Sequence, residues 1–259
     1  MIGQIIIIAV TAVALAQLNT LATSIYLHRT LAHRSLTLRP AADVLFRALL
    51  WLLTGGSRQQ WVAVHRKHHT YTDRPGDPHS PLLLGFWKVQ LWNIYYYILE
   101  ARNPVTVRKF APDLAPDAWE RYVFSWGWVG LGLGTMLVGL AIGWWQGLVA
   151  MILHGILFMF VLAPLINGLG HWRGGQNFEN TAYNSRVLAY VTGGESLHNN
   201  HHAFPRSPKF SLRRSELDPS WLAIRLLAAA KLALIVGVPI GALGGAAALQ
   251  GADGPDVDG

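Results

Sequence analysis

The histidines of this chain constrain its fold most strongly, because nine of the 11 fall into four short clusters. The spacing H-x-x-H-H occurs twice, in residues 65–69 and 198–202, and H-x4-H occurs in residues 28–33. In the fourth cluster, Asn167 precedes His171 by four residues. Side chains three or four residues apart share a helix face, so each cluster can direct its side chains at one point. The clustered histidines are His28, His33, His65, His68, His69, His171, His198, His201 and His202.

Clusters of this kind predict metal binding. Neutral imidazole is the commonest metal ligand, and nitrogen-rich sites suit iron, zinc, copper or nickel. The histidines are too many for one ion, so we expect two ions with about four or five nitrogens each. Asn167 can join one site directly or through a water molecule. Carboxylates usually hold the outer nitrogen of such histidines. The candidates for this role are Glu195 and either Asp73 or Asp77.

Two histidines lie outside these clusters. His154 stands alone in an apolar segment, where we expect a structural hydrogen-bonding role. His79 lies in a proline-rich loop, and a ligand role for it stays open. Metal identity does not follow from the histidine count. Apolar helices able to enclose a lipid chain favour redox iron over zinc, which has no redox chemistry.

Composition points to a membrane protein. The chain is 52% hydrophobic and only 14% charged, against about 25% charged in average globular proteins. It contains no cysteine, which excludes disulfides, zinc–thiolate sites and an iron–sulfur cluster bound by this chain. The net charge of +7 arises from basic residues that flank apolar segments. This placement is typical of membrane topology, and we expect no nucleic-acid partner.

Three uncharged segments are expected to cross the hydrocarbon core, which takes about 20 residues. These expected spans are residues 3–27, 122–142 and 144–166. The first lacks the basic start and cleavage site of a signal peptide, so we interpret it as a retained helix. The other two form a hairpin around Gly143. Residues 44–56 and 82–99 are predicted to be interfacial helices.

These spans place all four clusters on one side of the membrane. Every Lys and Arg lies in residues 28–121 or 173–231, and the positive-inside rule therefore puts the clusters in the cytoplasm. We predict a single domain over residues 1–259: an all-α integral membrane protein with about three transmembrane helices, interfacial helices and a cytoplasmic histidine-rich di-metal cap. The cap is formed by residues 28–121 and 167–221. Residues 222–249 are apolar and could insert in the membrane, and residues 250–259 are expected to be disordered.

The three histidine motifs, in residues 28–33, 65–69 and 198–202, resemble the boxes of membrane fatty acid desaturases, most closely the Δ9, stearoyl-CoA-desaturase-like group. Four further features match: Trp61 four residues before His65, Asp77-Pro78-His79, the pair Asn167 and His171, and Gly194-Glu195. The resemblance covers roughly residues 20–225. Members usually have two spans before the first box, whereas the residues before His28 leave room for one.

The resemblance implies a centre of two iron ions bound by the nine clustered histidines, with Asn167 holding a water molecule and no catalytic residue beyond the ligands. It implies insertion of a cis double bond, Δ9 by analogy, into a saturated acyl chain, with O2 as co-substrate. Trp61 would line the acyl tunnel or serve packing. A separate ferredoxin, rubredoxin or cytochrome b5-like donor is required, and the substrate is an acyl-CoA, acyl-carrier-protein or lipid ester. The expected location is a bacterial-type inner membrane.

Two other readings remain open from the sequence. A lipid or alkyl-chain hydroxylase could use the same di-iron scaffold, although related hydroxylases carry H-x3-H variants that fit less well. A non-catalytic membrane metal-binding protein or a zinc hydrolase belongs to another class. Apart from Glu195, the clusters have almost no acid–base group beside them, which disfavours the hydrolase.

Overall fold

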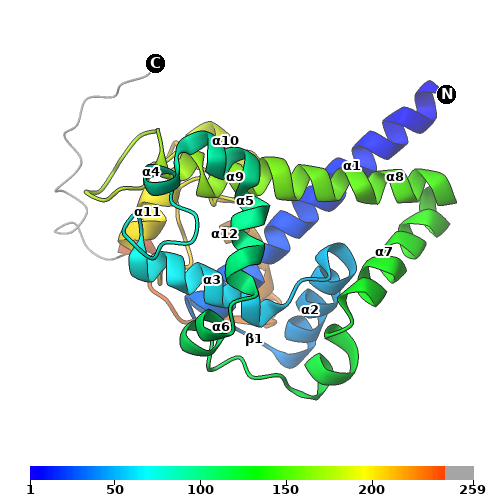
Figure 1. Ribbon diagram of the computed structural model, residues 1–259, viewed down its shortest axis with the longest axis horizontal. Helices are drawn as coiled ribbons and strands as arrows, with labels where there is room; N and C mark the ends of the chain where they lie inside the picture. Colours follow the sequence, from blue (N-terminus) through cyan, green and yellow to red (C-terminus); the bar gives the residue numbers. More distant parts are fainter. Residues whose placement is uncertain (243–259) are drawn as a thin grey trace.

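The structure is a computed structural model, and its described part comprises residues 1–242 (Figure 1). Most of this part is helical, with one small two-stranded sheet. The predicted all-α character is therefore correct in the main. The expected disorder of residues 250–259 lies outside the described residues.

The chain begins with a long apolar helix that leads directly into the first histidine cluster. Helix α1 spans Ile2–Ala22 and continues as the π-helix η1, Thr23–Ala32. Together they form a candidate membrane span by length and composition, Ile2–Ala32. Ile8 and Ala12 pack against Ala150 of a later helix.

The second histidine cluster is carried by a helix that follows a glycine turn. Helix α2 covers Pro40–Thr54 and ends at Gly55, whose φ of +61° suits glycine. Helix α3, Arg58–Tyr71, begins after Ser57, whose side chain accepts a hydrogen bond from the backbone N–H of Gln60. The predicted apolar segment 44–56 is thus most of α2 and the turn after it.

Three helices follow the second cluster: α4, Pro81–Leu84; α5, Phe86–Ala101; and α6, Pro104–Phe110. Helix α5 is broken at Trp92, which has φ −119° and ψ 22°. Its outward side exposes Trp87, Leu91 and Tyr95. Such aromatic side chains are typical of the headgroup level.

The predicted hairpin is present around Gly143, which has a φ of +105°. Its arms are α7, Gly127–Ile142, and α8, Trp144–Ile156. Helix α8 crosses α1, whereas α7 leads back toward α2 (Figure 1). The second arm continues through η3, Leu157–Leu162, α9, Ala163–Asn167, and η4, Leu169–His171.

The three predicted spans become two long candidate spans and one shorter apolar helix. The second long candidate is Trp144–His171, whereas α7 has only 16 residues. The reason is that Trp126, with φ −87° and ψ 64°, separates α7 from the short π-helix η2, Glu120–Phe124.

The C-terminal part folds back over the histidine-bearing elements. It contains α10, Arg186–Val191; α11, His198–Ala203; α12, Pro219–Ala229; strand β2, Ala233–Ile235; and η5, Ile240–Ala242. Strand β2 pairs antiparallel with β1, Leu36–Leu38. The described part of 222–249 therefore does not form one inserted helix, because the chain turns at Lys231 (φ +59°) and continues as a strand. The rest of that segment lies outside the described residues.

Candidate metal centre and cavity

Five histidines from three separate segments form a first group. His28 comes from η1, His33 follows it, His65 and His69 come from α3, and His201 from α11. One ring nitrogen of each lies within 4.8 Å of the corresponding nitrogens of the others. The structure thus joins parts of three sequence clusters at one point.

Four histidines form a second group beside the first. It consists of His68, His171, His198 and His202, again with ring nitrogens within 4.8 Å of one another. His69 and His202 stack at a centroid distance of 4.4 Å, so the two groups are direct neighbours. All nine clustered histidines belong to these two groups, and none belongs to both.

Carboxylates hold the outer nitrogens of three of these histidines. Nδ1 of His28 lies 2.5 Å from Glu195. Nδ1 of His68 lies 3.0 Å from Asp77, and Nδ1 of His171 lies 2.8 Å from Asp73. The structure therefore brings all three candidate carboxylates to the groups, and Asp73 and Asp77 serve different histidines. A proton held on Nδ1 leaves the lone pair of Nε2 directed into the group.

Nitrogens facing one another in this way fit a bound cation. Nε2 of His28 lies 3.0 Å from Nε2 of His201, and the corresponding His33–His65 distance is 2.8 Å. Removal from water lowers the pKa of six of these imidazoles well below its usual value, and the neighbouring histidines lower it further. The six are His33, His65, His69, His198, His201 and His202. Neutral imidazoles are the form that ligates metals, and their converging lone pairs suit a metal ion.

The three carboxylates are held in the charged form. Burial raises the pKa of each, but hydrogen bonds and opposite charges outweigh it, so the pKa of Glu195, Asp73 and Asp77 is lowered. For Glu195 the main opposing influences are His28 and Arg29. A charged carboxylate accepts the imidazole N–H and makes the ring a better donor.

One buried arginine was missed by sequence reasoning. The Arg29 side chain is fully buried, with Nη1 2.7 Å from Glu195 and Nη2 3.1 Å from Asp218. Its guanidinium lies 3.6 Å from the ring centroid of Phe210. Arg29 thus links Asp218, which follows α11 in the chain, to Glu195, the carboxylate that contacts His28. Its position beside a cluster histidine was the available signal.

The two histidines outside the clusters have different surroundings. His79 stacks on His68 at a centroid distance of 4.6 Å and, with His68 and Asp77, forms a third group of possible ligands. Burial lowers the pKa of His79 to about 3. His154 is buried elsewhere, with Nε2 3.2 Å from the carbonyl oxygen of Leu53, in agreement with a structural role.

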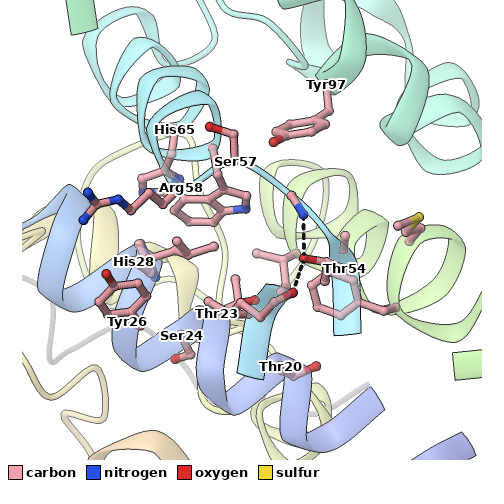
Figure 2. A pocket seen from close by; sticks show the side chains of 18 of the residues that line it. Thr20, Thr23, Ser24, Tyr26, His28, Thr54, Ser57, Arg58, His65 and Tyr97 are labelled. Carbon is pink, nitrogen blue, oxygen red and sulfur yellow. Dashed lines mark hydrogen bonds between the residues drawn. The ribbon is translucent and has the colours of Figure 1, made fainter. Parts of the chain in front are cut away.

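A cavity of about 350 Å³ adjoins both groups. Figure 2 shows side chains from η1, α2, α3 and α5 around it, among them His28, His65 and Tyr97. Trp61 lines this cavity and stacks on His65 at 5.0 Å. Asn167 lines it together with His68 and His198, and its Nδ2 donates to Asn93. Much of the remaining wall is apolar, including Leu50, Ile94, Phe158, Met159 and Leu162.

Charged residues also line this cavity. Arg47, Arg58 and Glu120 contribute to its wall. Each arginine pairs with both Asp117 and Glu120 at 2.8–3.1 Å. This network joins α2 and α3 to the segment before α7. The sequence placed these residues in the predicted cap, residues 28–121, but did not indicate their position beside the cavity.

Comparison with known proteins agrees with this geometry. The model of the fatty acid desaturase family matches residues 5–223. An acetylenase of hex-5-enoyl-[acyl-carrier protein] from Moorena producens is 34% identical, over 80% of this chain and 70% of the relative. The acyl-CoA C20 Delta5-desaturase of Anemone leveillei is 32% identical, over 84% and 69%.

A third relative carries a different substrate name. The sn-1 stearoyl-lipid 9-desaturase of Synechocystis is 27% identical, over 82% of this chain and 66% of the relative. The Delta-9 desaturase-like 2 protein and the Delta-9 acyl-lipid desaturase 2 of Arabidopsis thaliana are each 33% identical, over 88% and 82% of this chain and 76% and 69% of the relatives. The chain therefore belongs to the fatty acid desaturase family as a Δ9 desaturase-like member and is an oxidoreductase that desaturates fatty acyl chains.

Proposed function

We propose that this protein is an O2-dependent di-iron desaturase that introduces a cis double bond, at Δ9, into a saturated fatty acyl chain. The observation that carries the proposal is the pair of adjacent histidine groups at the wall of a largely apolar cavity. His28, His33, His65, His69 and His201 would hold one iron. His68, His171, His198 and His202 would hold the other, with Asn167 contributing directly or through water. Iron at these positions would supply the O2-dependent oxidation of an unactivated C–H bond.

The residues of the chain provide position and environment for this reaction. Trp61 and the apolar wall would hold the acyl chain beside the histidines and exclude water. Glu195, Asp73 and Asp77 would fix the histidine rings through their Nδ1 protons. Specificity for one C–C bond requires that the chain be held in one register, which a rigid cavity supplies.

The electron donor would be another protein. The chain has no cysteine, so a ferredoxin, a rubredoxin or a cytochrome b5-like protein would deliver the electrons. Three of the relatives named above carry acyl-carrier protein, acyl-CoA and lipid in their names, so all three acyl carriers are candidates. We further propose that the protein spans a bacterial-type inner membrane with its histidine groups on the cytoplasmic side, in line with its basic residues.

The test is the fatty acid profile of cells that express the protein with a matched electron donor. We expect a new cis monounsaturated acid, with its double bond at Δ9 by mass spectrometry. His201→Ala removes a central nitrogen of the first group and should abolish the product. An exposed substitution, Glu179→Gln, serves as the matched control and should leave the product unchanged.

Each outcome bears on one part of the proposal. Hydroxylated chains in place of alkenes would make the protein a hydroxylase on the same scaffold. A double bond elsewhere would contradict Δ9 alone. Purified protein with zinc rather than iron, and no lipid change despite good expression, would overturn the di-iron proposal. Separating the lipids of these cells by acyl carrier, at successive times after expression begins, shows which ester first contains the alkene.

A further inference from the structure

Asn167 makes a hydrogen bond to a residue outside the two histidine groups. Its Nδ2 donates to Oδ1 of Asn93 at 3.1 Å. Asn93 belongs to α5, is 6% exposed and lines the same cavity as His68 and His198. The amide nitrogen of Asn167 is therefore turned toward α5.

This hydrogen bond also decides where the other end of the amide points. A carboxamide has its oxygen and its nitrogen on the same planar carbon, so fixing one fixes the other. Asn167 itself lines the same cavity as His68 and His198. Its oxygen can bind a metal ion or accept a hydrogen bond from bound water, whereas the NH2 group can only donate. Only one of the two amide orientations thus offers a ligand atom to the second histidine group.

The local structure of α5 and α9 supports this contact. The helical dihedrals of α5 break at Trp92, immediately before Asn93. Asn167 is the last residue of α9, and Gly168 follows it. A Cβ atom at Gly168 would lie 2.8 Å from Oε1 of Gln90, one turn before Asn93 on α5. Glycine at this position therefore leaves room for the Gln90 side chain of α5 beside the end of α9.

We propose that Asn93 is a positioning residue: it selects the orientation in which the carbonyl oxygen of Asn167, and not its NH2 group, faces the second histidine group. This inference rests on the proposed function, because it requires a metal ion at His68, His171, His198 and His202. Asn93 does not touch the metal and acts only through Asn167. Its effect should therefore be confined to one of the two metal sites.

The experiment is a cobalt(II) titration of the full-length, metal-depleted protein in detergent, followed by visible absorption. The wild type should bind two cobalt ions. Asn93→Leu should weaken one of the two by about 10–100-fold, the usual effect of removing a residue that orients a ligand. Asn167→Leu should weaken the same ion, and the double variant should lose no more than Asn167→Leu alone. Leu91→Ala, an outward position on the same helix, is the control and should match the wild type.

Two results would overturn the inference by removing the coupling. In one, Asn93→Leu binds both ions as the wild type does. In the other, the losses of cobalt affinity caused by Asn93→Leu and by Asn167→Leu add in the double variant. If Asn93→Leu does not fold, Asn93→Asp and Asn93→Ala replace it. Asn93→Asp keeps an acceptor oxygen and should bind both ions, whereas Asn93→Ala should bind one of them more weakly. Equal cobalt binding by these two variants would contradict the positioning role of Asn93. A wild type that binds fewer than two ions overturns the proposed di-metal function itself, which is a separate outcome.

Discussion

At the residue scale, Glu195 connects the first histidine group to the buried core. Its carboxylate contacts Nδ1 of His28, Nη1 of Arg29 and the hydroxyl of Ser24. Arg29 is fully buried and shares its charge between Glu195 and Asp218. The carboxylate therefore has two duties, orienting an imidazole and neutralising a buried guanidinium.

We expect Glu195→Gln to destabilise the protein by about 3 kcal/mol, the lower end for breaking a buried ion pair, because Asp218 still neutralises Arg29. The measurement is the unfolding transition in detergent, followed by tryptophan fluorescence. Glu179→Gln, which changes an exposed carboxylate, is the control and should leave the transition unchanged. Equal stability of both variants would show that Glu195 does not neutralise Arg29.

A second residue-scale prediction concerns the carboxylates of the second group. Asp77→Asn removes the charged partner of His68, and Asp73→Asn removes that of His171. Each substitution should lower metal affinity by about 10–100-fold. Metal content during dialysis against a chelator should show the loss of one ion, because the first group keeps Glu195 as its carboxylate. Loss of both ions in parallel would contradict the separation into two groups.

Sequence spacing predicted which histidines meet, but not how they divide. His68 and His69 are adjacent in the chain, yet they belong to different groups. Successive residues of a helix point about 100° apart, so the division depends on which elements pack on each side of α3. Arg29 with Asp218, and Asn93 with Asn167, were missed because these partners are 189 and 74 residues apart. No local pattern records such contacts.

At the element scale, glycines allow α7 to pack directly on α2. A Cβ atom at Gly134 would lie 2.2 Å from the carbonyl oxygen of Leu52, and one at Gly130 would lie 2.4 Å from that of Trp51. A Cβ atom at Gly132, on the same helix, would have nothing within 4 Å. Small residues of this kind let helix backbones approach closely.

We therefore expect opposite effects from two alanine substitutions on α7. Gly134→Ala should destabilise the protein by about 1–3 kcal/mol, because backbone atoms of α2 must move. Gly132→Ala should be neutral or stabilising, since alanine has the higher helix propensity. The two share the propensity change, so the difference between their unfolding transitions isolates the helix contact. Similar transitions would show that α2 and α7 are not closely packed.

An ion pair links α3 to the segment after α6 and predicts a pH dependence. Asp113 lies 2.5 Å from Arg66 and 2.7 Å from Arg34. The hydrogen bond from Arg66 outweighs partial burial and holds the pKa of the Asp113 carboxyl well below its usual value. A lowered folded-state pKa stabilises the protein above the unfolded-state pKa, about 3.9, and this contribution is lost as pH falls further.

We expect the stability difference between the wild type and Asp113→Asn to be constant from pH 7 to 5. Below about pH 4 it should shrink, because the aspartate becomes protonated in the unfolded state. Unfolding of both proteins in detergent at a series of pH values measures this stability difference. A difference that grows on acidification would mean that Asp113 is not held by its arginines.

At the scale of the whole molecule, apolar length predicted the candidate spans only in part. Residues 3–27 and 144–166 lie within long helices, but 122–142 does not form one helix because the chain breaks at Trp126. The 16 residues of α7 rise about 24 Å at 1.5 Å each, less than the roughly 30 Å of a hydrocarbon core. Hydropathy counts residues but does not register a change of backbone direction. The folding back of β2 onto β1 was missed for the same reason.

The absence of cysteine in the sequence permits a direct test of the proposed topology. Trp145→Cys places a thiol at the exposed hairpin end, and Glu179→Cys places one at an exposed position between His171 and α10. In intact cells, a membrane-impermeant maleimide should label the first from outside and the second only after permeabilisation, because basic residues follow the histidines and are absent from the hairpin turn. The unsubstituted chain is the control and should not be labelled. Labelling of both thiols from the same side would mean that the hairpin does not cross the membrane, and a reversed pattern would place the histidine groups outside.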